Sequence, residues 1–548
     1  MKSRIIFVFI ITLAVILRFT QLGGNPPGLY WDEASLGYNA YSILKTGKDE
    51  HGEFLPIARF TAFGDYKPPG YIYAAVPFMA IFGLSDFSVR APSALAGVLM
   101  VLVTFFLVKE LLENEEETDL GKRWNRDATA TLAALFLAIS PWSIMLSRAA
   151  FEANLAALFN LLGVYFLIKT RKNAKFLFLS SLFFILSFYT FNANRIIAPL
   201  LFSGLLLIIL GRKLLSFKKE IFISFLIWIV LLLPSFQYLK GQESKIRLQE
   251  VSIFNNLEPL KVANLRIAVD KNSLWARIAH NRRLSYLKEY LDGYFKNFSG
   301  RFLFTNGDRN PRFSTGEIGN LYLFDLPFLL LGTYFLFKKR KEAALPIFFW
   351  MLVIPVPAAF AKEVPHALRI ISILPTYQIL TAYGFISFLN FFKKKKTFIF
   401  WGAVFGIIFL FNIFYFFHNY FIHYPSWSFK EWQYGYKELV KEVSRMENDY
   451  EKVVITESVD RPYIYFLFYR EYDPRKYWQE REARSDIFGF WEISGFGKYK
   501  FGLNYLGNQR GQKTLVVLGP NEDVEGFKEV KEISGLDKKT VFKIGEVR

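Results

Sequence analysis

The stretch MKSRIIFVFIITLAVILRF, residues 1–19, begins with basic residues and continues as an apolar run. As an α-helix, such a run is long enough to cross a hydrocarbon core of roughly 30 Å. Its start is typical of a secretory signal, but no small-x-small cleavage pattern precedes the following GGNPPG. We therefore expect this stretch to be kept as the first membrane helix.

The composition of the whole chain agrees with a membrane protein. Of its 548 residues, 52% are hydrophobic and 18% aromatic, including 61 Phe, far above the usage of an average soluble domain. The chain has no Cys, which excludes disulfides, thiolate catalysis and Cys-based metal sites. Apolar runs of spanning length recur, and we expect about eleven spans, at 5–22, 89–108, 128–147, 152–168, 176–191, 196–211, 221–239, 321–337, 343–360, 370–391 and 397–417.

The basic residues indicate how these spans are oriented. The formal net charge of +19 could suggest nucleic acid, but the Lys and Arg clusters fall between apolar segments, at 169–175, 212–219, 338–341 and 393–396. Such clusters are typical of cytoplasmic loops and of lipid headgroup contact. We therefore expect a multi-pass protein of the plasma or inner membrane, with a cytoplasmic N-terminus and no nucleic-acid partner.

The segment YIYAAVPFMAIFGL, 71–84, tests this assignment because counting it as a span would move every later basic cluster outside. It is only 14 residues long, so we expect a short helix on the outer membrane face. A membrane domain over 1–424 would then carry outer loops at about 23–88 and 240–320. The remaining residues, 425–548, would form an outer C-terminal domain.

This C-terminal part reads as a small α/β domain. Strand-like runs at VVITESV (453–459), YIYFLFY (463–469) and TLVVLGP (514–520) alternate with amphipathic stretches such as YKELVKEVSRM (436–446). No Gly-rich phosphate loop accompanies them, so a nucleotide site is not expected there.

Ionisable residues on the predicted outer face are the candidate functional groups, because charges at membrane depth are costly and commonly serve function. They are Asp32, Glu33, Asp65, Lys67, Arg148, Glu152, Arg195, Arg309, Arg312, His366 and Arg369.

Each candidate also has a structural interpretation. Asp32 and Glu33 could open a surface helix, where acids suit the positive helix end. Arg148 and Glu152, four residues apart, could form an ion pair. The arginines before the sixth and tenth spans could anchor their helices at the interface. The functional interpretation depends on all of them sharing one membrane face.

Carboxylates facing cations at a membrane surface suit transfer of a group from a lipid phosphate. The cations would stabilise the phosphate as its negative charge grows. A carboxylate would take the proton from an attacking acceptor hydroxyl. At a sugar carbon, such a single displacement inverts the anomeric centre and, with phosphate leaving, requires no general acid.

Three motifs then carry a family resemblance. PPGLYWDEASLGYNAYSI (26–43), YKPPGYIYAAVPFMAIFG (66–83) and SVRAPSALAGVLMVL (88–102) follow one another in order. This succession resembles the GT-C superfamily of membrane glycosyltransferases. It is most similar to bacterial relatives of protein O-mannosyltransferases and lipid A aminoarabinose transferases, which use a polyprenyl-phosphate sugar donor.

The resemblance implies roles for residues of the first loop. Asp32 matches the catalytic base and Glu33 its companion, while Lys67 matches a basic residue near the donor phosphate. In the aminoarabinose branch the position before that Lys is acidic. Here it is Tyr66, with Asp65 one residue earlier, so a divalent metal ion is the one cofactor left open.

The resemblance extends less closely to later residues. Arg148 and Glu152 fall at a turn between spans where these families often place an arginine and an acid. NGDRNPRFSTGE, with Arg312, and KEVPHALRIISILP, with His366 and Arg369, resemble later family motifs. These residues are the predicted substrate-binding set, together with Asp65, Lys67 and Arg195.

The sequence thus predicts a hexosyl or pentosyl glycosyltransferase. It would move a sugar from a polyprenyl-phosphate donor to a hydroxyl of a lipid, glycan or protein on the outer membrane face, with inversion. A flippase or transporter of lipid-linked sugars is the alternative, although such proteins often show repeated halves, and we find no internal repeat. A scaffold with a degenerate site is a third interpretation, which the intact Asp-Glu pair disfavours.

Overall fold

The computed structural model describes residues 2–63, 65–113, 126–241, 252–392, 395–485, 490–507 and 513–547. The chain forms two compact units, each built from separate segments. The first comprises Met1–Leu17, Ala96–Leu146 and Glu152–Phe416. The second comprises Arg18–Leu95, Ser147–Phe151 and Phe417–Arg548.

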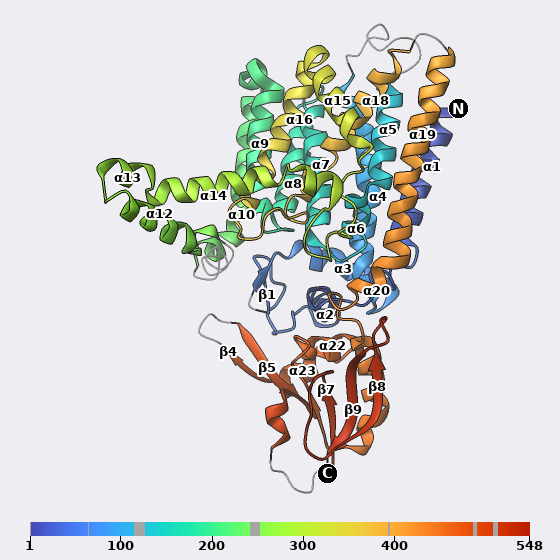
Figure 1. Ribbon diagram of the computed structural model, residues 1–548, viewed down its shortest axis with the longest axis vertical. Helices are drawn as coiled ribbons and strands as arrows, with labels where there is room; N and C mark the ends of the chain where they lie inside the picture. Colours follow the sequence, from blue (N-terminus) through green and yellow to red (C-terminus); the bar gives the residue numbers. More distant parts are fainter. Residues whose placement is uncertain are drawn as a thin grey trace. The chain divides into compact units, whose positions relative to one another are not determined.

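The helices that coincide with the predicted spans lie mainly in the first unit (Figure 1), and the ends of some of them belong to the second. Each of the eleven predicted ranges contains a helix or a broken pair of helices. They are α1 (Lys2–Phe19), α4 (Asp86–Leu111), α5 (Arg126–Ile139) with α6 (Pro141–Ser147), α7 (Glu152–Lys169), α8 (Phe176–Phe188), α9 (Asn194–Leu210), α10 (Lys218–Lys240), α15 (Asp325–Lys339), α16 (Lys341–Val353) with α17 (Pro355–Ala358), η4 (Ile371–Ile373) with α18 (Thr376–Leu389), and α19 (Lys395–His418).

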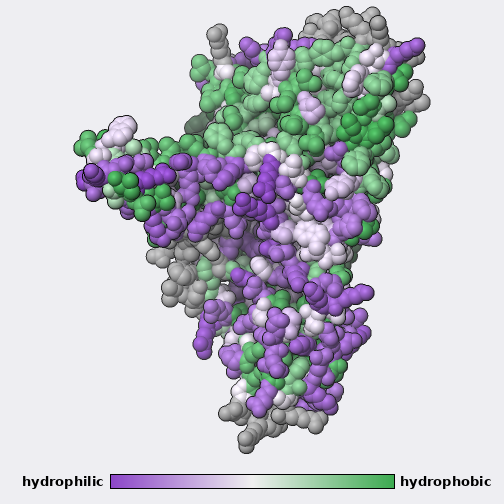
Figure 2. All heavy atoms as spheres, viewed as in Figure 1, coloured by the Kyte–Doolittle hydropathy of each residue, from purple (hydrophilic) through white to green (hydrophobic). Residues whose placement is uncertain are grey.

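Several of these helices have the length and composition of membrane spans. Among the described residues, six are long and apolar enough, and α5 with α6, bent by 54°, adds a seventh if counted as one span. Helices α1, α8 and α9 are apolar but shorter. Hydrophobic side chains, including Leu207 of α9 and Phe411 of α19, point outward from the unit, as Figure 2 shows for the visible face. The chain is therefore a multi-pass membrane protein, while the number of eleven spans and their orientation stay predictions.

Two helices of this unit approach each other very closely. On α15, a Cβ atom added to Gly332 would lie 1.9 Å from the carbonyl oxygen of Leu380 on α18. On α18, a Cβ atom at Gly384 would lie 1.9 Å from the carbonyl oxygen of Phe328 on α15. Small residues at such positions allow backbones to pack against one another inside a membrane.

The predicted second outer loop is mostly helical where it is described. It contains η2 (Ile253–Asn255), α12 (Glu258–Val269), α13 (Leu274–Ala279), α14 (Arg282–Lys296) and the short π-helix η3 (Arg301–Thr305). A further short helix, η1 (Gly211–Phe217), joins α9 to α10.

The second unit combines segments of the first predicted loop with the C-terminal part. The loop contributes α2 (Trp31–Thr46), the antiparallel strands β1 (Phe60–Ala62) and β2 (Asp65–Lys67), and α3 (Gly70–Phe82). Helix α3 confirms the short helix predicted at 71–84. The C-terminal helices are η5 (Asn419–His423), α20 (Tyr424–Ser428), α21 (Tyr436–Met446), η6 (Glu447–Asp449), α22 (Pro462–Tyr469), α23 (Pro474–Glu480) and η7 (Leu503–Leu506).

A seven-stranded mixed sheet forms the core of the C-terminal part, in the order β4-β5-β6-β3-β7-β9-β8 (Figure 1). Central strand β3 runs parallel to β6 and β7, and the other pairs are antiparallel. The strands are β3 (Lys452–Ile455), β4 (Glu482–Ser485), β5 (Trp491–Phe496), β6 (Tyr499–Phe501), β7 (Thr514–Leu518), β8 (Phe527–Ser534) and β9 (Thr540–Val547). The predicted α/β domain is confirmed, with β3, β7 and α21 at predicted positions.

One prediction in this domain was wrong. The run 463–469, predicted as a strand, is helix α22. Pro462 occupies its first turn, where the fixed φ of proline suits a helix and its missing N–H is not needed. Residues 462–468 are all buried, so the run shows neither the alternation of a half-buried strand nor the polar face of a surface helix.

Helix α22 packs tightly against α2. A Cβ atom at Gly37 of α2 would lie 2.5 Å from the ring of Phe468 and 2.4 Å from Val89. The hydroxyl of Tyr38 donates a hydrogen bond to the carbonyl of Tyr472, 3.0 Å away. The C-terminal domain thus holds the helix that carries the two candidate acids.

Candidate active site

The adjacent acids Asp32 and Glu33 lie in the first turn of α2. The helix begins after Tyr30, and the Trp31 backbone N–H donates to the side chain of Gln433 at 3.0 Å. Acids in a first turn are stabilised by the positive end of the helix. Both acids therefore lie at the start of a helix, as the structural interpretation predicts. The two side chains, however, have different neighbours.

Glu33 is fully buried and held by several donors. Its two carboxylate oxygens accept hydrogen bonds from Nε and Nη2 of Arg90, each at 2.9 Å. The Ala150 backbone N–H donates to the same carboxylate at 2.8 Å, and that of Tyr30 at 3.4 Å. A two-pronged Arg–carboxylate pair fixes geometry as well as charge, so Glu33 is locked in place.

Arg90 completes this arrangement from α4. Its guanidinium also donates to the backbone carbonyls of Leu22 at 3.1 Å, Pro26 at 2.8 Å and Gly28. Its central carbon lies 5.6 Å from the centre of the Trp432 indole ring. Arg90 thus ties the loop before α2 to the buried acid. It was not among the predicted site residues, although an arginine near the start of an apolar helix was the signal that could have identified it.

Asp32 lies in a more open place and pairs with a lysine. Lys67 Nζ lies 2.6 Å from Asp32 Oδ1. The Asp32 side chain is 29% exposed, whereas that of Lys67 is 7% exposed. Lys67 ends β2, and Pro68 and Pro69 then lead into α3. The structure therefore brings together an accessible carboxylate and a buried ammonium group, as the sequence predicts for the first loop.

Asp65 starts the same short strand. Its carboxylate accepts a hydrogen bond from the Tyr66 backbone N–H at 2.7 Å. Strand β2 pairs Asp65 with Ala62 of β1. Among the described residues, no group of three or more His, Asp or Glu side chains is arranged to hold a metal ion, and metal dependence stays an open prediction.

Arg148 belongs to the second unit, in the turn that also contains Ala150. It is fully buried, and its Nη2 donates to the carbonyls of Thr20 at 2.8 Å and Asn25 at 2.9 Å. The rings of Tyr420 and Phe421 flank the guanidinium. These contacts give Arg148 a role in holding the chain before α2, close to where Glu33 is anchored.

The other candidates lie in the first unit. Glu152 is the first residue of α7. Arg195, on α9, has its guanidinium carbon 4.6 Å from the ring centre of Tyr238 and 5.9 Å from that of Phe188. Packing against rings of neighbouring helices agrees with the anchoring interpretation of this arginine.

The two later motifs meet in the first unit. Asp308 accepts a hydrogen bond from the Ala367 backbone N–H at 2.6 Å, and its Oδ2 lies 3.8 Å from Nδ1 of His366. The His366 ring packs against Phe313, with ring centres 4.9 Å apart. Asp308 therefore helps to join the two loops. It lies in the NGDRNPRFSTGE motif but is not among the predicted site residues.

Burial shifts the titration of this pair in opposite senses. It lowers the pKa of His366 well below its ordinary value, with a further contribution from the positive charge of Arg369. It raises the pKa of Asp308, against the hydrogen bonds that its carboxylate accepts. His366 is therefore neutral at physiological pH, and its approach to Asp308 is not an ion pair.

Arg369 and Arg312 lie close in sequence to His366 and Asp308, respectively. Nη1 of Arg369 donates to the carbonyl of Glu363 at 2.9 Å. The Arg312 backbone N–H donates to Asn310 Oδ1 at 3.0 Å, which shapes the loop. Arg309, beside them, is exposed.

Comparison with known proteins agrees with the family resemblance. Residues 8–240 match the family described as dolichyl-phosphate-mannose-protein mannosyltransferase. The Bacillus subtilis (strain 168) protein named "Putative mannosyltransferase YkcB" is 28% identical over 215 residues, which cover 39% of this chain and 28% of that protein. "Putative mannosyltransferase YycA" of the same organism is 30% identical over 155 residues, 28% of this chain and 21% of that protein. The match thus spans about a quarter of each relative.

Solved structures share the fold over nearly the whole chain. ArnT from Cupriavidus metallidurans in the apo state has a TM-score of 0.54 at 12% identity and covers 98% of this chain and 97% of its own. The same protein bound to undecaprenyl phosphate gives a TM-score of 0.53 at 11% identity, with the same coverage. The family matched by residues 8–240 and the fold shared with ArnT agree with the resemblance of the first-loop motifs to the GT-C superfamily.

Proposed function

We propose that this protein is a glycosyltransferase that moves a sugar from a polyprenyl-phosphate donor to an acceptor hydroxyl on the outer face of the membrane. The observation that carries the proposal is the contrast between the two adjacent acids. Glu33 is locked by Arg90, whereas Asp32 is accessible and paired with the buried Lys67. An accessible carboxylate beside a cation is the minimal set for base-assisted attack with a phosphate leaving group.

The reaction is a single displacement at the anomeric carbon. The acceptor oxygen forms a bond to that carbon while its proton passes to the Asp32 carboxylate. The bond from the anomeric carbon to the phosphate oxygen breaks, and polyprenyl phosphate leaves with the electron pair. Attack opposite the leaving group inverts the anomeric centre.

Lys67 can stabilise negative charge both before and after the proton transfer. Before the reaction, its ammonium pairs with the Asp32 carboxylate. When Asp32 becomes neutral by taking the proton, the same ammonium becomes available to the phosphate that is gaining charge. A buried cation paired with the base can therefore compensate whichever of the two groups is negative.

Support for the donor comes from the relatives. The matched family is named for dolichyl-phosphate-mannose, and the ArnT neighbour binds undecaprenyl phosphate. A polyprenyl-phosphate hexose is accordingly the donor we propose, with Arg312, His366, Arg369, Glu152 and Arg195 as further candidates for substrate binding. Arg148 is a positioning residue in this proposal, because its contacts hold the chain that leads to α2.

The test is reconstitution of the purified full-length protein in liposomes with a radiolabelled polyprenyl-phosphate mannose. The proposal predicts that labelled sugar becomes covalently joined to an acceptor in a membrane-glycan extract and that one polyprenyl phosphate is released for each sugar transferred. Movement of intact donor between leaflets without a covalent product would instead indicate a flippase.

A further inference from the structure

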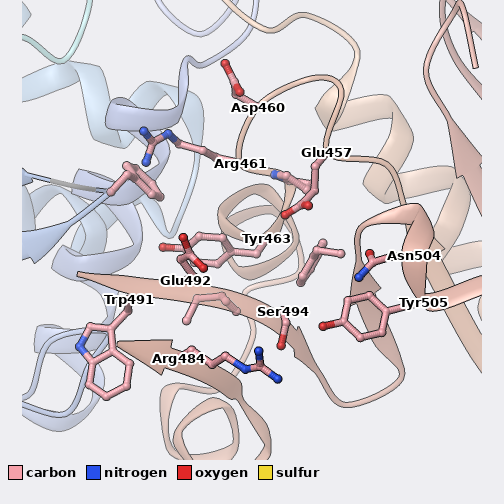
Figure 3. A pocket seen from close by; sticks show the side chains of 14 residues that line it. Glu457, Asp460, Arg461, Tyr463, Arg484, Trp491, Glu492, Ser494, Asn504 and Tyr505 are labelled. Carbon is pink, nitrogen blue, oxygen red and sulfur yellow. The ribbon is translucent and has the colours of Figure 1, made fainter. Parts of the chain in front are cut away.

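A pocket lies in the second unit, in the C-terminal domain. It has a volume of about 460 Å³ and is lined by residues of β4, β5, α22 and η7, with Phe63 from the β1–β2 segment (Figure 3). This volume falls in the usual range of small-molecule sites, roughly 300–1,000 Å³. The transfer chemistry described above uses none of its lining residues.

Aromatic rings line much of this pocket. They belong to Phe63, Tyr463, Trp491, Phe501 and Tyr505. Rings of this kind offer flat apolar faces, and those of Tyr and Trp add a polar edge. Flat faces match the C–H faces of pyranose rings, so a sugar is one ligand that this lining accommodates.

Charged and amide side chains stand between the rings. Glu457, Glu492, Arg484 and Asn504 project toward the hollow in Figure 3. Carboxylates, guanidinium and amide groups each present two neighbouring hydrogen-bonding atoms. Two neighbouring atoms of this kind can bind two adjacent hydroxyl groups, an arrangement that sugars offer repeatedly.

The charge balance of the pocket disfavours an anionic ligand. Its lining contains three carboxylates, Glu457, Asp460 and Glu492, against two guanidinium groups, Arg461 and Arg484. Partial burial and the facing carboxylate of Glu492 raise the pKa of Glu457. Phosphates and uronic acids would meet this negative field, whereas neutral hydroxyl groups can donate to it.

The pocket walls are held in place by the backbone and by neighbouring rings. Gly502 has φ +105°, and a Cβ there would lie 2.4 Å from Asn504 Oδ1 and 3.2 Å from Glu457 Oε2. The indole of Trp491 stacks on the His51 ring, with centres 5.9 Å apart, and on the Arg481 guanidinium at 5.0 Å. Side chains fixed in this way lose little freedom when a ligand binds.

One wall of the pocket lies beside the start of α2, the helix that carries the candidate base. The guanidinium carbon of Arg461 lies 4.6 Å from the ring centre of Phe63 and 5.5 Å from that of Trp31. Trp31 is the residue before Asp32 in the first turn of α2. A ligand that fills the pocket and extends past Arg461 would therefore reach the first turn of α2, in which Asp32 lies.

We propose, on the basis of the proposed function, that this pocket binds a neutral oligosaccharide belonging to the acceptor. The acceptor is then a glycan: its sugars occupy the pocket, and a hydroxyl at one end reaches the Asp32 carboxylate. The C-terminal domain selects the acceptor, while the Lys67 side of α2 meets the donor phosphate.

Binding can be measured without turnover. Saturation-transfer NMR on the full-length protein in nanodiscs would use mannobiose, cellobiose and N,N′-diacetylchitobiose as neutral probes, with galacturonic acid and inorganic phosphate as anionic probes. We expect at least one neutral disaccharide to bind, and Trp491→Ala and Glu457→Ala each to weaken it about tenfold or more, as the loss of one good contact would. Glu529→Ala, an exposed acid on β8, is the matched control and should bind as the wild type does.

Three results in this assay would overturn the pocket assignment. The first is the absence of neutral disaccharide binding up to millimolar concentrations in a folded protein. The second is binding that both pocket variants leave unchanged, and the third is binding of the anionic probes only. Glu457→Ala replaces an exposed side chain, so it keeps the test decisive if Trp491→Ala fails to fold.

Steady-state kinetics then separates acceptor from donor. With a glycan acceptor, Glu457→Ala should raise the KM for the acceptor about tenfold and leave the KM for the lipid donor unchanged. A raised KM for the donor alone would overturn the acceptor assignment. Sugar binding in a protein that transfers nothing would contradict the proposed function but not the pocket, and transfer with an unchanged acceptor KM would contradict only the pocket.

Discussion

At the residue scale, Asp32 and Glu33 are neighbours in the chain but lie in different surroundings. Successive residues of a helix point about 100° apart, so one acid faces the buried Arg90 while the other meets Lys67 near solvent. The sequence predicted that Asp32, Glu33 and Lys67 act together. It could not show which acid is accessible, because that depends on Arg90 and the Ala150 N–H, both distant in the chain.

The Glu33–Arg90 pair should be essential for stability. Because each partner is fully buried, Glu33→Ala or Arg90→Ala leaves an uncompensated buried charge, which costs about 3–5 kcal/mol. We expect each single variant to lower the thermal unfolding midpoint in detergent strongly. The double variant should lose less than the sum of the two, and additive losses would argue against a direct pair.

Lys67 should matter for the donor rather than for folding. In Lys67→Ala, Asp32 loses its partner but stays partly exposed, so no charge is left buried. The expected result is a kcat lowered by about tenfold or more, equivalent to about 1.4 kcal/mol of lost transition-state stabilisation, with a normal unfolding midpoint. Lys45→Ala, on the same helix α2, is the control, and an unchanged kcat in Lys67→Ala would contradict the role of Lys67.

His366 should make stability depend on pH. Its pKa in the folded protein is lowered by burial, whereas in the unfolded chain it is ~6.5. The unfolded state therefore binds more protons as pH falls below ~6.5, and stability decreases with falling pH. The raised pKa of Asp308 has the opposite effect and favours the folded state as pH falls. The contribution of His366 therefore has to be measured as a difference between two proteins.

That difference is between the wild type and His366→Gln, which cannot take up the proton. Unfolding midpoints measured from ~pH 7.5 to ~pH 5.5 should fall more steeply for the wild type than for the variant. Parallel curves would show that His366 is not held neutral.

At the element scale, sequence periodicity and run length predicted most helices correctly. They failed for α22, a segment that is buried on every side. The predicted apolar ranges contain helices, as expected because a chain in lipid can satisfy its backbone polar groups only internally. The error at α22 has a local cause: a run that is buried on every side has the same apolar composition in either conformation. Pro462 was the one signal that favoured the helix.

The close approach of α15 and α18 gives a prediction at this scale. Gly332→Ala and Gly384→Ala place a methyl group against a backbone carbonyl of the facing helix. Forcing these helices apart should cost about 1–3 kcal/mol each and lower the unfolding midpoint. Gly402→Ala on α19, where a Cβ meets nothing within 4 Å, is the matched control and should be neutral or slightly stabilising. Equal midpoints for all three would contradict the backbone contact.

At the scale of the whole molecule, the chain order does not follow the compact units. The second unit draws on residues 18–95, 147–151 and 417–548, so the loop bearing the acids and the C-terminal sheet belong together. The sequence predicted an α/β domain, but not the order of its seven strands, because pairs such as β3 with β6 are set by contacts distant along the chain. The predicted boundary at 424/425 and the number of spans stay predictions.

The most direct test of the central claim, that Asp32 is the catalytic base of sugar transfer, is the turnover of Asp32→Asn. The amide keeps the shape of the side chain but cannot take the acceptor proton, and a general base contributes about 10²–10⁴-fold to rate. In reconstituted liposomes we expect transfer to fall at least about a hundredfold, with normal insertion, an unchanged unfolding midpoint and unchanged donor binding. Turnover by this variant close to that of the wild type would contradict the account.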